Sequence, residues 1–158
     1  MDLQLFIIKV GKIIAKIPYE IRIRQKLAYR YAKKDLQNFN LYNNQQQQKE
    51  IYHRIKKLVD YSYSNITFYK SYYDQMGFHP SQLNSFKDIS LIPIISKSIL
   101  LKTSISERSF IYKDSVKKNT GGSSGQTLDF YERLVASGSE WAHMHHIWKK
   151  LHYKTSQL

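Results

Sequence analysis

The sequence predicts an α/β protein that is rich in helices, with one β-hairpin around a glycine- and serine-rich loop and a helix after it. Three observations lead to this class. Apolar residues recur at helical spacing in several segments, and residues 116–131 hold a loop without large side chains between two short extended runs. Hydrophobic residues make up 42% of the 158 residues, so the chain can bury a core and is not expected to be disordered.

Residues 3–17 are predicted to form an amphipathic helix. Phe6, Val10 and Ile13 recur at helical spacing and define an apolar face. The lysines of this stretch share a different face: Lys9, Lys12 and Lys16. Pro18 is expected to end the helix, because proline cannot continue its hydrogen bonding.

The N-terminal region, residues 1–48, is strongly basic and is predicted to be a helical unit of its own. Nine Lys or Arg residues and one acid, Glu20, lie between Lys9 and Lys34, and the whole chain has a formal net charge of +13. Such a stretch can pack its apolar face on the rest of a larger protein, or it can lie on an anionic membrane surface. Both interpretations stay open, and residues 1–34 are the candidate membrane contact.

The middle of the chain is predicted to be helical after a polar entry. Residues 35–48 are rich in Asn and Gln and are expected to form a loop or helix entry, followed by a helix over about residues 47–63. Four aromatic residues then recur at helical spacing and are assigned to the core: Phe68, Tyr69, Tyr72 and Tyr73. Gly77 is expected to end their helix, and Ser96 to cap the next one.

A further helix is predicted over about residues 132–152, with Gly138 allowing a close approach to a sheet. His143 and His146 lie three positions apart on it, with Glu140 on the same side, a spacing that suits a metal ion. No fourth ligand is evident in the sequence. Ordinary hydrogen bonds are therefore the favoured role of these histidines, and no metal site is assigned.

The centre of the predicted hairpin, Thr120-Gly121-Gly122-Ser123-Ser124-Gly125, carries no large side chain. A backbone of this kind can turn tightly and direct several N–H groups and three hydroxyls at one anion. It is not a Walker A motif, because Gln126 stands where that motif has lysine, and its glycines lack the dinucleotide-binding spacing. From the loop alone, a flexible hairpin turn is the alternative to a phosphate site.

The loop and the Gln-Thr-Leu that continues it resemble the phosphate loop of adenylate-forming enzymes. The nearest branch is the phenylacetate-CoA ligase-like group, which includes the CapK-type capsular polysaccharide biosynthesis proteins. Three other segments resemble this branch in the same order: residues 58–69 (Leu-Val-Asp-Tyr-Ser-Tyr-Ser-Asn-Ile-Thr-Phe-Tyr), residues 91–97 (Leu-Ile-Pro-Ile-Ile-Ser-Lys) and the helix with Glu140, Trp141 and Trp148. The resemblance spans about residues 50–155. Thr67 and Thr127 depart from it, since the family usually has proline there.

The resemblance implies that residues 49–158 are the N-terminal portion of an AMP-binding adenylation domain. The implied activity is ATP-dependent, AMP-forming activation of a carboxylate, followed by acyl transfer to CoA or to another thiol or amine acceptor. The loop would bind the β- and γ-phosphates through these residues: Thr120, Gly121, Gly122, Ser123, Ser124, Gly125 and Gln126. ATP and Mg²⁺ are the implied cofactors. The family's Mg²⁺ ligands and catalytic residues lie further downstream, so a truncated chain that does not complete adenylation alone is expected.

A non-catalytic basic module that binds an anionic membrane or nucleic acid is the alternative function. Nucleic acid is the less favoured partner, because the sequence has no RNA-recognition motif, zinc-finger spacing or recognisable helix-turn-helix. The chain has no cysteine, which excludes thiol catalysis and disulfides. Asp2 and the interspersed lysines argue against a signal peptide. A cytoplasmic protein, peripheral at the inner membrane face if residues 1–34 bind there, is the expectation.

Overall fold

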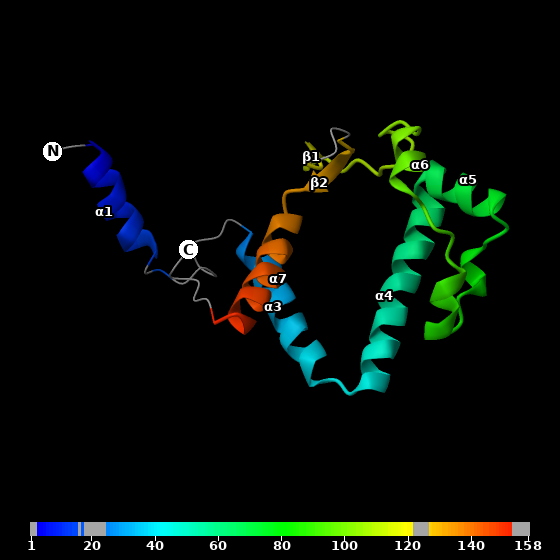
Figure 1. Cartoon of the computed structure of the whole chain (residues 1–158), viewed down its shortest axis with the longest axis horizontal. Helices are drawn as coiled ribbons and strands as arrows, with labels where there is room; N and C mark the ends of the chain where they lie inside the picture. The colour runs from blue at the N-terminus through cyan, green and yellow to red at the C-terminus, as the bar shows by residue number, and fades with distance from the viewer. Residues whose placement is uncertain (1–2, 16, 18–24, 122–126, 153–158) are drawn as a thin grey trace. The chain divides into compact units, whose positions relative to one another are not determined.

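A computed structural model describes residues 3–15, 17, 25–121 and 127–152. These residues form helices and one two-stranded antiparallel sheet, which agrees with the predicted helix-rich α/β class (Figure 1). Contacts divide the chain into two compact units. The first combines Met1–Leu41 with Arg133–Leu158, and the second is Tyr42–Glu132. None of the helices within the described ranges is long and apolar enough to cross a bilayer.

The first unit contains α1 (Leu3–Ala15), α3 (Lys26–Leu41) and α7 (Ala136–Lys150). Helices α3 and α7 pack side by side, with Tyr29 and Ala142 buried between them (Figure 1). Gly138 is the point of close approach, because a Cβ built there would lie 2.7 Å from the carbonyl oxygen of Gln25. Gly138 therefore allows a close approach to the α3 helix. The prediction that it would approach a sheet was wrong.

The second unit is built on α4 (Asn44–Asn65) and α5 (Thr67–Gln75). Its buried hydrophobic cluster consists of these residues: Val59, Tyr73, Phe78 and Leu83. Tyr69 and Tyr72 are half-buried and pack against the cluster, so the predicted core role is confirmed for Tyr69, Tyr72 and Tyr73. Phe68 is half-buried outside the cluster and stacks on Tyr72. The α5 helix ends as predicted, with Gly77 at a φ of 68° just after it.

The polar stretch at residues 35–48, predicted as a loop or helix entry, is helical over most of its length, so the loop alternative was wrong and the helix-entry alternative is confirmed at the start of α4. It includes the end of α3 and the start of α4. The Oδ1 of Asn43 accepts the N–H of Gln46 at 2.9 Å, and the Oε1 of Gln46 accepts the N–H of Asn43 at 3.0 Å. This reciprocal capping fixes the start of α4, and glutamine is a good helix former, so a polar run can propagate the helix.

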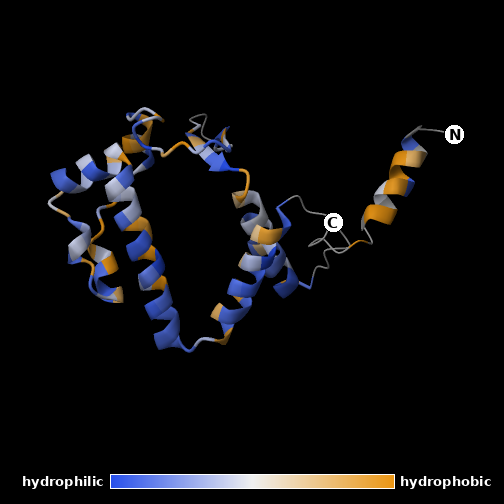
Figure 2. Cartoon of the chain, turned by 180° about the vertical axis from the view of Figure 1, so that it is seen from behind, coloured by the Kyte–Doolittle hydropathy of each residue, from blue (hydrophilic) through white to orange (hydrophobic). Residues whose placement is uncertain are grey.

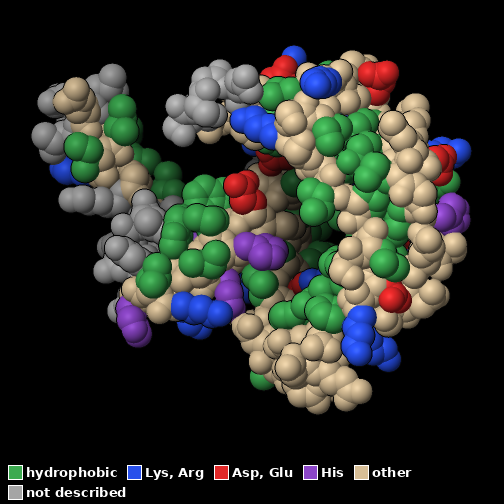
Figure 3. Space-filling model, turned by 45° about the vertical axis from the view of Figure 1, so that its right-hand side comes forward, with side chains coloured by type: hydrophobic (Ala, Val, Ile, Leu, Met, Phe, Trp, Pro, Cys, Tyr) green, Lys and Arg blue, Asp and Glu red, His purple; other side chains and the backbone are tan. Residues whose placement is uncertain are grey.

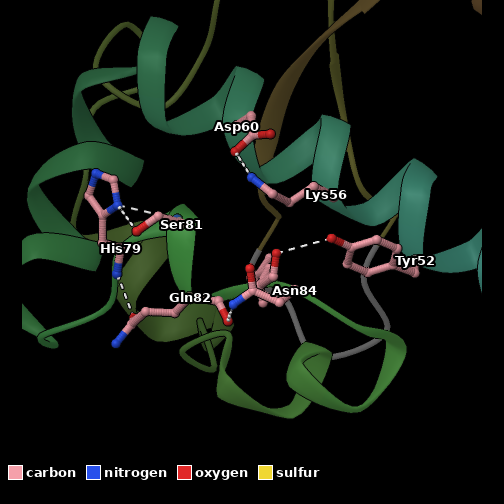
Figure 4. Close-up of polar contacts among 8 residues, drawn as sticks. Tyr52, Lys56, Asp60, His79, Ser81, Gln82 and Asn84 are labelled. Atoms are coloured by element: carbon pink, nitrogen blue, oxygen red, sulfur yellow. Dashed lines mark hydrogen bonds and ion pairs between the residues drawn. The ribbon is translucent and has the colours of Figure 1, made fainter.

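Short turns connect α5 to the rest of the second unit: η1 (Pro80–Gln82), η2 (Phe86–Leu91) and α6 (Lys97–Leu101). The Nδ1 of His79 accepts the N–H of Ser81, so His79 caps η1, and Tyr52 of α4 donates its hydroxyl to the carbonyl of Leu83 at 3.1 Å (Figure 4). Ser96 caps α6 as predicted. The bond from Tyr52 to Leu83 ties the connecting segment to α4.

The sheet is a hairpin of β1 (Ser115–Asn119) and β2 (Asp129–Arg133), which confirms the predicted strands on either side of the loop. The helix after the hairpin begins at Ala136 and not near Glu132. Glu132 belongs to β2, where it forms an ion pair with Lys118 of β1. Strand pairing therefore extends beyond the point at which the sequence predicted a helix.

Candidate functional site

The base of the glycine-serine loop is closed by two hydrogen bonds between Thr120 and Leu128. The backbone N–H of Thr120 donates to the carbonyl of Leu128 at 3.0 Å. The backbone N–H of Leu128 donates to the Oγ1 of Thr120, also at 3.0 Å. Antiparallel pairing thus continues past the strand ends and holds the two ends of the loop together.

Two of the seven candidate site residues, Thr120 and Gly121, are described, and both are exposed. A Cβ built on Gly121 would have no heavy atom within 4 Å, so the space beside this backbone is open. The hydroxyl oxygen of Thr120 accepts a hydrogen bond from the backbone N–H of Leu128, and the hydroxyl proton can still be donated to a ligand. The remaining candidates lie outside the described residues: Gly122, Ser123, Ser124, Gly125 and Gln126.

The cations nearest to the loop in sequence are held by acids on the neighbouring strand. The Nζ of Lys117 lies 2.8 Å from the Oδ2 of Asp129, and Lys118 pairs with Glu132. The hydrogen bond to Asp129 raises the pKa of Lys117 above its ordinary value. An anion at the loop would therefore rely on N–H and O–H donors, and on a cation that arrives with it. These ion pairs were not predicted from the sequence, although lysines and acids on two strands predicted to pair indicate cross-strand ion pairs.

A pocket of about 390 Å³ adjoins the hairpin. Residues from several parts of the second unit line it: Leu58, Tyr61 and Ser62 of α4, Ile66, Tyr69 of α5, Leu100 of α6, Arg108, Ser109, Phe110 and Tyr112 of the connecting segment, and Leu128, Phe130 and Tyr131 at β2. Its volume lies within the usual range for small-molecule sites. Leu128 belongs both to the base of the loop and to the pocket wall, so the two features are contiguous.

Several polar side chains of this pocket already form hydrogen bonds. The hydroxyls of Tyr61 and Tyr112 share a hydrogen bond of 2.5 Å, and the Nε of Arg108 donates to the carbonyl of Thr103 at 3.4 Å. Arg108 gives a largely aromatic wall one positive charge. The pocket was not predicted from the sequence, because the residues that line it come from several separate segments. The only local signal was a single arginine before the alternating aromatics Phe110 and Tyr112.

The histidines of α7 have hydrogen-bond partners. The Nδ1 of His143 lies 2.7 Å from the carbonyl oxygen of Ser139, and the side-chain amide of Asn40 lies 3.3 Å from the Nε2 of His146. Within the described ranges, no three His, Cys, Asp or Glu side chains are grouped so that they could hold a metal ion.

Comparisons of the chain with family models, with curated proteins and with solved structures found no match. The candidate site is therefore defined by the loop residues, the hairpin that carries them and the adjoining pocket.

Proposed function

We propose that residues 50–155 form the phosphate-binding portion of an ATP-dependent, AMP-forming carboxylate ligase. In this proposal the loop at residues 120–126 holds the β- and γ-phosphates of MgATP, and the activated acyl group passes to CoA or to another thiol or amine. The supporting observation is the ordered set of four segments that resemble this family, with the glycine-serine loop held between two paired strands. A role in capsular or surface polysaccharide synthesis is part of the same proposal.

The chemistry explains why such a loop is needed. A carboxylate is a poor electrophile, because direct attack on it would have to expel oxide. Joining it to AMP supplies a better leaving group, and negative charge develops on the phosphates as this happens. Hydrogen-bond donors that already point at that charge stabilise the transition state. The backbone amides of the glycines and the hydroxyls of Thr120, Ser123 and Ser124 are the donors in this chain.

The described part of the site fits this role. Gly121 leaves room for a phosphate to approach its backbone, and the Thr120 hydroxyl still has a proton to donate. Lys117 and Lys118 are already paired with acids, so Mg²⁺ bound with ATP would supply most of the positive charge. The aromatic pocket beside Leu128 offers space for the rest of a ligand.

The test is MgATP binding by the chain, measured by titration calorimetry. Gly121→Val adds a side chain where the hairpin has space for it, so the fold should survive while the approach of a phosphate is blocked. A second variant changes Thr120, Ser123 and Ser124 to Ala. We expect each to weaken binding by roughly tenfold or more, because hydrogen bonds to charged groups contribute about 1.5 to 3 kcal/mol each.

Gly11→Val is the control, since a Cβ there also has no neighbour within 4 Å but lies in α1. It should bind MgATP as the unchanged chain does. The proposal fails if the unchanged chain does not bind MgATP, or if the loop variants bind as tightly as the control. Binding that depends only on the basic residues at positions 9–34 and falls steeply with salt would support the basic-module alternative.

A further inference from the structure

The helix α1 displays a band of apolar side chains to solvent. Ile7 is 60% exposed and Ile13 is 64% exposed, and further apolar residues of α1 are exposed as well: Phe6, Ile8, Val10 and Ile14. Figure 2 shows α1 as a largely hydrophobic ribbon, and Figure 3 shows hydrophobic side chains on its surface at the left of the view. Contiguous exposed apolar surface of this kind marks an interaction site, because leaving it in water is unfavourable.

The apolar and charged residues of α1 lie on different sides of the helix. Phe6, Val10 and Ile13 follow the helical repeat along one side, whereas Lys9 is exposed on another. At 13 residues, α1 is shorter than the roughly 20 residues that a membrane-spanning helix needs. A short helix with one apolar and one basic side suits a position in the plane of a bilayer surface.

We propose that α1 docks on a bilayer that contains anionic phospholipids, with its isoleucine face among the acyl chains and Lys9 at the headgroups. Charge complementarity favours an anionic bilayer as the binding partner of α1. Nine cations and one acid lie between Lys9 and Lys34, within a chain of net charge +13. Nucleic acid would use the cations but would leave the isoleucine face in water, so the bilayer accounts for both features. This docking does not depend on nucleotide binding.

The experiment is co-sedimentation of the full chain with vesicles of mixed phosphatidylcholine and phosphatidylglycerol, and with vesicles of phosphatidylcholine alone. The double variant Ile7→Ser with Ile14→Ser reduces the apolar face, and Ile94→Ser is its matched control, because Ile94 is 89% exposed in the second unit. Lys9→Glu reverses a charge on α1, and Lys87→Glu reverses an exposed charge elsewhere. All four variants change exposed side chains, so folding should be retained, and circular dichroism checks this.

We expect binding to the mixed vesicles to be clearly stronger than to phosphatidylcholine alone. The isoleucine double variant and Lys9→Glu should each weaken it by roughly tenfold, while both controls bind as the unchanged chain does. Equal binding by the α1 variants and their controls would overturn the proposal, and so would absence of vesicle binding. It would also be overturned if a single-stranded oligonucleotide bound the chain in preference to the vesicles and the isoleucine variant left that binding unchanged.

Discussion

Tyr29 and His145 show at the scale of single residues how one contact joins distant parts of the sequence. The hydroxyl of Tyr29 lies 2.8 Å from the Nδ1 of His145, and both side chains are buried. The rings of Trp141 and Trp148 pack against His145 at centroid distances of 5.6 and 5.7 Å. A polar pair buried beside aromatic rings must keep its hydrogen bond, since an unsatisfied buried group is costly. This pair therefore fixes how α3 meets α7.

Tyr29→Phe should destabilise the chain by about 1 to 3 kcal/mol, because it removes the hydroxyl and takes this partner from a buried imidazole nitrogen. Denaturant unfolding monitored by tryptophan fluorescence measures the change. Tyr31→Phe is the matched control, since Tyr31 lies in the same helix and is 75% exposed. Equal effects of the two substitutions would show that the Tyr29–His145 bond does not stabilise the helix pair.

Asp88 is predicted to titrate below the ordinary aspartate value. Its Oδ2 accepts the backbone N–H of Asn84 at 2.9 Å and both the backbone N–H and the hydroxyl of Ser85. These bonds favour the carboxylate and lower the pKa of Asp88 below its ordinary value, with the bond from Asn84 contributing most. The depressed pKa means that this stabilisation is present above the unfolded-state pKa and is lost as the pH falls through the folded-state pKa.

An NMR titration of the Asp88 carboxyl carbon tests this prediction. The midpoint in the folded chain should lie at a lower pH than the midpoint of the same group in the urea-unfolded chain. Coincident midpoints would mean that the turn at Asn84 and Ser85 does not hold the carboxylate.

At the scale of elements, the sequence predicted those structural features that depend only on residues close to one another in the chain. The hairpin around the glycine-serine loop, the α5 stop at Gly77 and the Ser96 cap were all visible in the sequence and are present. The pairing of α3 with α7 was not predictable in the same way, because Tyr29 and its partner His145 are 116 positions apart in the sequence. Tertiary packing of this kind leaves no periodic signal in a single sequence.

Residues 35–48 are a case in which composition left two alternatives open, a loop or a helix entry, and the structure has the helix entry. A run of Asn and Gln is typical of loops, but the reciprocal bonds between Asn43 and Gln46 nucleate α4 within it. The loop residues of the candidate site were predicted from the sequence, whereas the adjoining pocket could be found only in the folded structure. The residues that line it come from α4, α5, α6, the 108–112 segment and β2, which only the folded chain brings together.

Gly138→Ala should destabilise the α3–α7 pair. The new methyl group would lie 2.7 Å from the carbonyl oxygen of Gln25 and 3.0 Å from the Cβ of Ala28, so the helices must separate. Overpacking of this size typically costs about 1 to 3 kcal/mol, which outweighs the gain of roughly 1 kcal/mol from better helix propensity. Thermal unfolding followed by circular dichroism measures the net effect.

Gly11→Ala is the matched control for this prediction, because a Cβ on Gly11 has no neighbour within 4 Å and should only improve helix propensity. If the Gly138→Ala variant is as stable as the Gly11→Ala variant, α3 and α7 do not approach each other as closely at Gly138 as described.

At the scale of the whole molecule, the two proposed activities belong to different units. The base of the loop and the adjoining pocket lie in Tyr42–Glu132, whereas α1 belongs to the unit formed by Met1–Leu41 and Arg133–Leu158. Substitutions in α1 should therefore change vesicle binding without changing MgATP binding, and loop variants should do the reverse. This separation also distinguishes a specific phosphate site from general attraction of anions to a chain of net charge +13.

The measurement that tests the central claim most directly is an NMR titration of the ¹⁵N-labelled chain with MgATP. If the loop binds the phosphates, the largest amide shifts should occur at residues 120–126, led by Gly121, Gly122 and Gly125, and should saturate together. Gly121→Val should require roughly tenfold or more MgATP to reach the same shifts, while the rest of the spectrum remains that of the folded chain. Saturable shifts confined to the basic residues at positions 9–34, with the loop amides unmoved, would contradict the phosphate-loop assignment.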